Sequence, residues 1–214
     1  MDNQEIKFPA HGIELNGYLV RPDEKVPRPG ILVVHEIFGL NENIRNIANR
    51  FAEQGYVALA VDLFSGRSRT VCMFSLFSGM MLNSLHHGGI RDLKAALDYL
   101  AALPGVDADR LGAVGYCLGG SLAIALACAD QRLKAIAPYY AMNPRPLKAV
   151  ARLCPVVGSY PAEDFTAKAG ESLQAELEHY EVPNDIKVYP GAKHSFFNDQ
   201  NPSSYHPDAA QDSW

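Results

Sequence analysis

The sequence has few cysteines, no block of positive charge and no long apolar run, and each absence narrows the class of protein. The four cysteines, Cys72, Cys117, Cys128 and Cys154, form no C-x-x-C pair and are too few to cross-link a chain of 214 residues. The 19 basic and 24 acidic residues give a formal net charge of −5. Without a basic run, nucleic acid and anionic membrane surfaces are poor partners, so we expect a small-molecule partner.

A targeting or membrane-spanning segment is also missing from the pattern. The first five residues are polar and acidic, without the cationic flank and apolar stretch of a signal peptide. The most apolar window, residues 71–81, is interrupted by two serines and a glycine and is too short to cross a bilayer. We therefore expect a reduced, cytoplasmic protein that is a monomer or a small homo-oligomer.

What the sequence does contain is the alternation of an α/β protein. Residues 4–9 and 16–21 alternate in polarity around Gly12 and predict an antiparallel hairpin. Residues 31–34 and 57–61 are continuous apolar runs, which are typical of parallel strands covered on both faces. Further strands are expected at residues 111–115, 134–138, 155–160 and 186–190.

Helical patterns lie between these strands. Ile44, Ile47 and Phe51 share one face of an amphipathic segment that ends at Gly55, and residues 90–100 form a second amphipathic segment. Residues 117–129 are apolar or small nearly all round, which predicts a central buried helix. Further helices are expected around residues 173–177 and from residue 207. We expect one domain, residues 1–214, with a mostly parallel sheet and helices on both faces.

The segment with the clearest chemistry is Gly115-Tyr116-Cys117-Leu118-Gly119, a G-x-C-x-G turn between a strand and a helix. This is the nucleophile-elbow pattern, with cysteine in the usual place of serine. The flanking glycines permit a tight turn that presents Cys117 at the carboxyl edge of the sheet. A position at a helix N-terminus predicts a lowered pKa for the thiol.

Two other glycine-rich motifs resemble this turn in part. Residues 115–121 read G-x-x-x-x-G-S, but the lysine that a phosphate-binding loop requires is absent, and the spacing of a dinucleotide fingerprint is absent too. A buried structural cysteine in a helix cap stays open as the alternative.

No cofactor is expected. His86 and His87 are adjacent, so their side chains point apart, and no metal site is expected.

A cysteine nucleophile needs a base and an acid that orients the base. His194 directly follows the last expected strand, and Asp164 lies in the loop after the strand at residues 155–160. Both loops are expected at the carboxyl edge of the sheet, near Cys117. The chain order Cys, Asp, His is that of the α/β-hydrolase triad. Glu163 is the rival candidate for the acid.

The chain resembles the dienelactone hydrolase family over essentially its whole length. The resemblance is carried by His35-Glu36-Ile37-Phe38-Gly39, Gly55-Tyr56-Val57, Asp62-Leu63-Phe64, residues 115–120 and His194-Ser195-Phe196. It implies an α/β-hydrolase fold, with Cys117 as nucleophile, Asp164 as orienting acid and His194 as base. It also implies that Glu36 faces the cysteine and takes part in its activation, and that the backbone N–H groups of Ile37 and Leu118 form the oxyanion hole.

From the residues alone, a carboxylate such as Glu36 after an apolar strand either pairs with a cation such as Arg45 or works at the site. His35 is interpreted as structural. Dienelactone hydrolases bind the substrate carboxylate with arginines, one of them shortly after the catalytic histidine, but Asn198 stands at that position here. A neutral amide binds a carboxylate more weakly than an arginine does.

Four residues are expected to bind substrate. Arg67 and Arg69 are the candidate cations for a substrate carboxylate, and Tyr116 and Phe38 are the candidate neighbours of the reacting group. Residues 71–82 lie where the family has a helical segment near the mouth of the pocket; their methionines and phenylalanines suit either core packing or an apolar pocket wall. The chain ends at Trp214 within an expected helix that continues further in the family, so we expect this helix to be incomplete.

The sequence therefore predicts a hydrolase that cleaves a carboxylic ester or lactone through a Cys117 thioester. An ester suits a thiol nucleophile better than an amide, because an amine leaves less readily than a thiolate. Two alternatives stay open. One is a carboxymethylenebutenolidase that uses Arg67 or Arg69 for the substrate carboxylate; the other is a binding protein that keeps the fold and pocket but does not catalyse.

Overall fold

The protein is built on one twisted sheet, seen in a computed structural model that describes residues 1–22 and 26–214. The eight strands lie in the order β1-β2-β4-β3-β5-β6-β7-β8. Strands β1 and β2 form an antiparallel hairpin, β2 is antiparallel to β4, and the other neighbours are parallel. The bounds are β1 Asp2–Ala10, β2 Ile13–Arg21, β3 Arg28–Val34, β4 Val57–Asp62, β5 Val106–Tyr116, β6 Leu133–Tyr139, β7 Val156–Pro161 and β8 Asn184–Tyr189.

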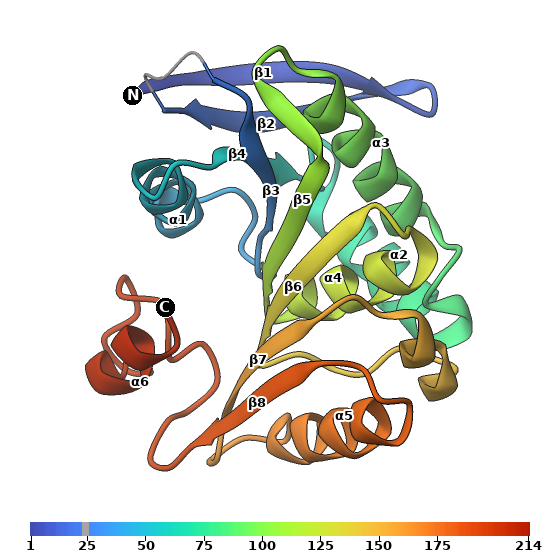
Figure 1. The fold of residues 1–214 in the computed structure, drawn as a ribbon, viewed down its shortest axis with the longest axis vertical. Helices are drawn as coiled ribbons and strands as arrows, with labels where there is room; N and C mark the ends of the chain where they lie inside the picture. Colours follow the sequence, from blue (N-terminus) through green and yellow to red (C-terminus); the bar gives the residue numbers. More distant parts are fainter. Residues whose placement is uncertain (23–25) are drawn as a thin grey trace.

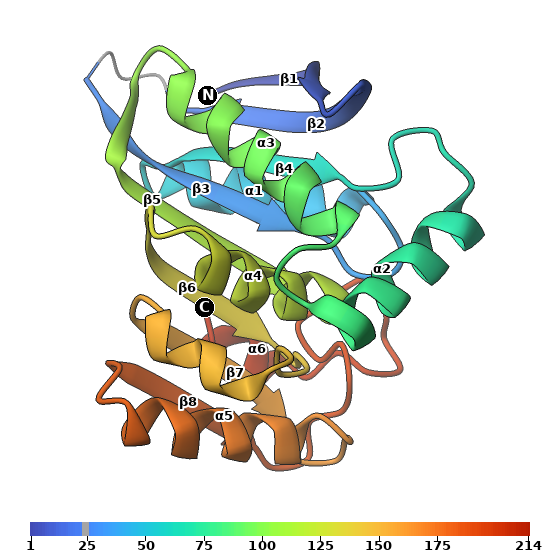
Figure 2. The same ribbon diagram turned by 90° about the vertical axis from the view of Figure 1, so that its right-hand side faces the viewer.

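Helices cover both faces of the sheet. In Figure 1, α1 and α6 lie on one side of the strands and α2 to α5 on the other. Figure 2 shows α3, α4 and α5 side by side across the sheet, with α2 beyond the ends of the strands. Their bounds are α1 Glu42–Glu53, α2 Arg69–Asn83, α3 Gly88–Ala102, α4 Leu118–Ala129, α5 Ala167–His179 and α6 Pro207–Asp212, with a 3₁₀ helix, η1, at Leu147–Arg152. The predicted α/β-hydrolase architecture is confirmed.

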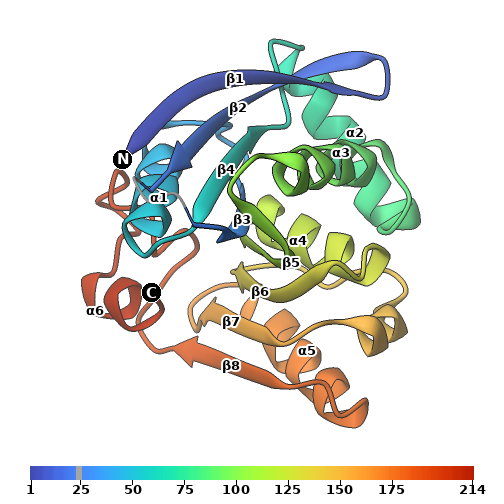
Figure 3. The same cartoon turned by 45° about the horizontal axis from the view of Figure 1, so that its top comes forward.

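Apolar patterning explains this arrangement. In β3 and β4 the central residues are buried on both faces, as their continuous apolar runs predicted. Helix α4 buries every residue from Leu118 to Cys128, so it is the central helix expected from its composition. Helix α1 is amphipathic, and the Asn41 side chain caps it by accepting from the Ile44 N–H. Figure 3 shows the hairpin of β1 and β2 curving over the edge of the sheet at β4.

Strand β5 and helix η1 differ from the sequence prediction. Strand β5 begins at Val106, ahead of the expected residue 111, and its pairing with β3 shifts register between Pro29 and Gly30. Helix η1 was not predicted, because a single short helix has too few turns to show a period. No helix among the described residues is both long and apolar enough to span a bilayer.

Candidate active site

Cys117 occupies a sharp turn between β5 and α4. Its backbone dihedrals are φ 56° and ψ −119°, a conformation that residues with side chains rarely adopt. The turn is tight because glycine permits close approach: a Cβ on Gly119 would lie 2.2 Å from the carbonyl oxygen of Val34, and one on Gly115 would lie 2.1 Å from the carbonyl oxygen of Gly119. The backbone therefore holds Cys117 at the carboxyl edge of the sheet.

The predicted base and acid lie beside this cysteine. The Nε2 atom of His194 is 3.0 Å from the Sγ atom of Cys117, and the Nδ1 atom of His194 is 2.5 Å from the Oδ2 atom of Asp164. The hydroxyl of Thr166 donates to the same Asp164 oxygen over 2.7 Å. The ring of Phe165 stacks on the imidazole with a centroid distance of 5.6 Å. Glu163, the rival acid, is exposed, so Asp164 is the carboxylate that pairs with His194.

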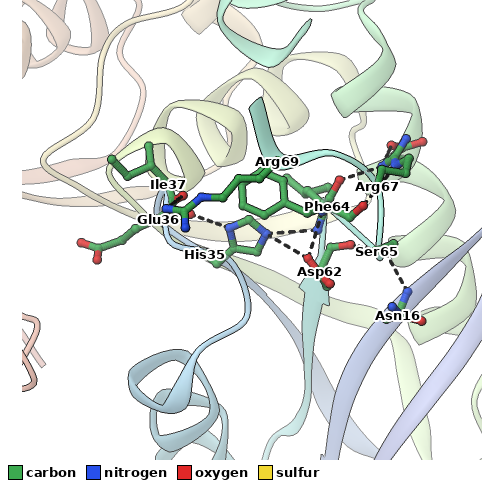
Figure 4. Close-up of polar contacts among 11 residues, drawn as sticks. Asn16, His35, Glu36, Ile37, Asp62, Phe64, Ser65, Arg67 and Arg69 are labelled. Carbon is green, nitrogen blue, oxygen red and sulfur yellow. Dashed lines mark hydrogen bonds and ion pairs between the residues drawn. The ribbon is translucent and has the colours of Figure 1, made fainter. Parts of the chain in front are cut away.

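Glu36 is buried at the end of β3 and is held by the loop that carries His194. Ser195 Oγ donates to its Oε1 over 2.8 Å, and Asn198 Nδ2 donates to its Oε2 over 3.2 Å. Arg45, considered as its cation from the sequence, instead pairs with Glu5. Asn198 thus uses its amide to hold Glu36. Figure 4 shows the Glu36 side chain directed away from the neighbouring His35.

The Cys117 thiol does not have the lowered pKa that the helix N-terminus predicted. Burial, followed by the negative charge of Glu36, raises the pKa of Cys117 to about 12, although hydrogen bonds from the backbone N–H groups of Leu118 and Ile37 oppose the rise. The prediction was wrong because a sequence shows the helix end but not the surrounding burial or the facing carboxylate. The resting group is a neutral thiol.

His35 lies behind the site in a fixed orientation. The backbone N–H of Leu63 donates to its Nε2 atom over 3.0 Å, so its Nδ1 atom carries the proton and donates to the carbonyl oxygen of Glu36 over 2.5 Å. Burial lowers the pKa of His35, which favours this neutral form. His35 ties the end of β3 to the loop after β4, and among the described residues no hydrogen bond or ion pair joins it to Cys117.

A cavity of about 340 Å³ opens above Cys117. Its lining comes from the loop after β3, from α2, from the start of α4, and from the loops after β6, β7 and β8. The lining residues are Ile37, Phe77, Met80, Met81, Cys117, Leu118, Ser121, Tyr140, Met142, Asn143, Arg145, Phe165, Thr166 and His194. Helix α2 thus lines the pocket, as one of its two sequence interpretations suggested.

The four residues expected to bind substrate are not in this lining. Tyr116 is fully buried and stacks on Tyr139. Arg67 pairs with Asp92 of α3, and Arg69 donates to the carbonyl oxygen of Ile37 with its guanidinium near the Phe38 ring. Figure 4 shows Arg69 extending toward Ile37, with Arg67 on the other side of Phe64.

Sequence reasoning missed the residues after β6 and β7. Met142, Asn143 and Arg145 follow β6, and Phe165 and Thr166 follow Asp164. A usable signal exists for them, because loops at the carboxyl ends of parallel strands build the sites of open α/β sheets. Their residue types carry no motif, so only this topological rule could have selected them.

A mostly parallel sheet covered on both faces, with a cysteine on the strand-to-helix turn and a histidine and aspartate beside it, defines an α/β-hydrolase. The chain belongs to the dienelactone hydrolase family, whose model matches residues 15–214. It is a hydrolase of that family, and its sequence relatives and structural neighbours agree with this assignment.

Two relatives and one solved structure illustrate the similarity. A protein of Saccharolobus solfataricus named "Putative carboxymethylenebutenolidase" is 30% identical over 250 residues, covering 99% of this chain and 95% of the relative. A protein of Yersinia pestis with the same name is 33% identical, covering 98% of this chain and 84% of the relative. The crystal structure titled "Putative Dienelactone Hydrolase" from Klebsiella pneumoniae matches with a TM-score of 0.87 at 29% identity, covering 100% of this chain and 95% of that one.

Proposed function

We propose that the protein hydrolyses a carboxylic ester or lactone through a thioester on Cys117. The observation that carries the proposal is the hydrogen-bonded series Cys117, His194 and Asp164, with contacts of 3.0 and 2.5 Å. A nucleophile, a base and an orienting acid within hydrogen-bond reach are what acyl transfer requires. Because the series is already assembled, no rearrangement of these three groups is needed before attack.

The resting thiol decides how the first step proceeds. With a pKa of about 12, Cys117 is not ionised near neutral pH, so His194 takes the proton as the sulfur attacks the carbonyl carbon. The new carbon–sulfur bond forms as the carbonyl electron pair moves onto oxygen. Asp164 holds the imidazole in the orientation that keeps Nε2 free to accept the proton.

The oxyanion is assigned to the backbone N–H groups of Ile37 and Leu118. Both N–H groups oppose the rise in the pKa of Cys117, so both lie near the sulfur, beside which the carbonyl oxygen of a bound ester would develop charge. Each such donor is worth about 3 kcal/mol of barrier in related chemistry. Collapse expels the alcohol oxygen, which takes the proton from His194, and His194 then activates a water that hydrolyses the thioester.

The test uses p-nitrophenyl acetate with the wild type, Cys117→Ala and Cys154→Ala. Cys154 is half-buried and is not part of the cavity, so it controls for a change at an unrelated thiol. We expect Cys117→Ala to lose turnover by at least 1000-fold, while Cys154→Ala keeps wild-type kcat/KM. Retained hydrolysis in Cys117→Ala overturns the mechanism.

A second candidate is a carboxymethylenebutenolidase, the activity in the names of the two relatives above. The observation that favours it is Arg145, which lines the cavity and is the cation there that could meet a substrate carboxylate, in place of Arg67 or Arg69. Under this candidate an anionic lactone loses kcat/KM in Arg145→Gln and with added salt, whereas a neutral ester does not. Lys148→Gln, an exposed change in the same region, is the control.

A further inference from the structure

The walls of the Cys117 cavity are built from large apolar side chains that solvent also reaches. Phe77, Met80 and Met81 come from one face of α2, at the spacing of residues that share a helix face. Phe77 is 48% exposed and Met81 57%, and across the cavity Met142 is 47% and Phe165 70% exposed. Contiguous exposed apolar surface of this kind costs solubility and marks a ligand-binding groove.

Three polar side chains of the lining already hydrogen-bond within the protein. Ser121 donates to the carbonyl oxygen of Cys117 and accepts from the Met142 N–H, Thr166 donates to Asp164, and the Asn143 amide group donates to the carbonyl oxygen of Ala169. The buried Tyr140 hydroxyl, the buried Asn143 Oδ1 atom and the exposed Arg145 side chain are the polar groups left over, whereas most of the remaining wall is apolar. A substrate in the cavity would therefore contact mainly methionine and phenylalanine side chains.

We infer that the apolar walls of this cavity select esters whose acyl group is an uncharged chain longer than acetyl, and that Phe77 and Met81 determine this preference. The inference rests on the proposed thioester mechanism. The acyl group stays bonded to Cys117 through both steps, so the walls contact it in both transition states. Methionine and phenylalanine adapt to a flexible chain better than polar or branched side chains do.

The size of the preference follows from burial. Each methylene moved from water into an apolar wall favours binding about fourfold. Hexanoate has four more methylenes than acetate, and part of its chain stays in solvent because the walls are half-exposed. We expect kcat/KM for p-nitrophenyl hexanoate to exceed that for p-nitrophenyl acetate by at least about tenfold.

Helix α2 supplies a matched pair of variants. Phe77 lines the cavity, whereas Phe74 is 76% exposed on the same helix and is not part of the lining. Phe77→Ser should reduce the hexanoate-to-acetate ratio of kcat/KM at least threefold, and combination with Met81→Ser should reduce it further. Phe74→Ser should leave the ratio unchanged, and thermal unfolding of each variant checks that the fold is kept.

The outcomes separate the inference from the function on which it rests. A wild-type ratio below tenfold, or equal loss in Phe74→Ser and Phe77→Ser, overturns the inference while Cys117-dependent hydrolysis stands. If neither ester is turned over, the proposed function fails. The rates at which N-hexyl and N-ethyl iodoacetamide alkylate Cys117 then test whether the cavity selects apolar groups. Faster labelling by the hexyl reagent, lost in Phe77→Ser, supports apolar selection; equal rates overturn it.

Discussion

Replacement of Glu36 by glutamine tests whether this carboxylate keeps Cys117 in the thiol form. With a pKa of about 12, the thiolate at pH 8 amounts to roughly one molecule in 10⁴. Burial is the larger cause of the raised pKa and the Glu36 charge the next. Glu36→Gln removes the charge and keeps the shape, so the pKa of Cys117 should fall.

The loss of the Glu36 charge should increase the rate at which Cys117 is alkylated. The whole rise, from 9.0 to about 12, has burial as its larger cause, so removal of the Glu36 charge should lower the pKa by about one to two and raise the thiolate fraction about 10- to 100-fold. A less basic thiolate is also a weaker nucleophile, and this offsets about half of the gain on a logarithmic scale. Glu36→Gln should therefore label with iodoacetamide about 3- to 10-fold faster than the wild type at pH 8.

The assay is the second-order rate constant of labelling, followed by intact mass. Cys117→Ala measures the background from Cys72, Cys128 and Cys154. Glu163→Gln removes an exposed carboxylate from the loop next to Asp164 and should leave the rate unchanged. Equal or slower labelling of Glu36→Gln would refute the electrostatic argument and would instead favour Glu36 as a group that assists removal of the thiol proton.

Three further predictions concern stability. Burial raises the pKa of Cys128 from 9.0 to about 12, so between pH 9 and 12 the folded chain binds more protons than the unfolded chain and the free energy of unfolding falls as pH rises. Cys128→Ala should lessen this fall by about 1.4 kcal/mol per pH unit, measured by urea unfolding. Equal slopes in the wild type and the variant would contradict the prediction. Gly119→Ala should lower Tm by more than about 10 °C, because its Cβ meets main-chain oxygen at 2.2 Å, whereas Gly112→Ala, with its nearest heavy atom at 3.4 Å, should change Tm by less than about 3 °C. Asn198→Asp should cost about 3 to 5 kcal/mol at neutral pH by urea unfolding, because it sets a second buried carboxylate against Glu36, and a stable variant would show that the pair is solvated.

Local sequence patterns were enough to predict much of the fold. The apolar runs of β3 and β4 identify strands covered on both faces, and the small, apolar composition of α4 identifies the central helix. Helix η1 and the early start of β5 were not predicted, because a short 3₁₀ turn has no period and residues 107–110, three of them charged, do not have the pattern of a strand. Both depend on pairing and packing with distant segments.

The candidate site likewise contains features that the sequence could predict and features that it could not. Cys117, Asp164 and His194 could be brought together from the sequence, since each follows a strand of one parallel sheet and the carboxyl ends of such strands share an edge. The directions in which side chains point within those loops could not be predicted from the sequence. Arg67 and Arg69 were expected at the substrate, yet one pairs with Asp92 and the other with a backbone carbonyl.

The sequence by itself determined the architecture and the turn that presents Cys117, because strand periodicity and the need for glycine at close approach are local properties of the chain. Only the tertiary structure decided the protonation of that cysteine and the walls of its cavity. Burial, the charge of Glu36 and the apolar face of α2 act on the sulfur or its surroundings from segments far away in the chain. Such effects depend on distance in space, which the order of residues does not specify.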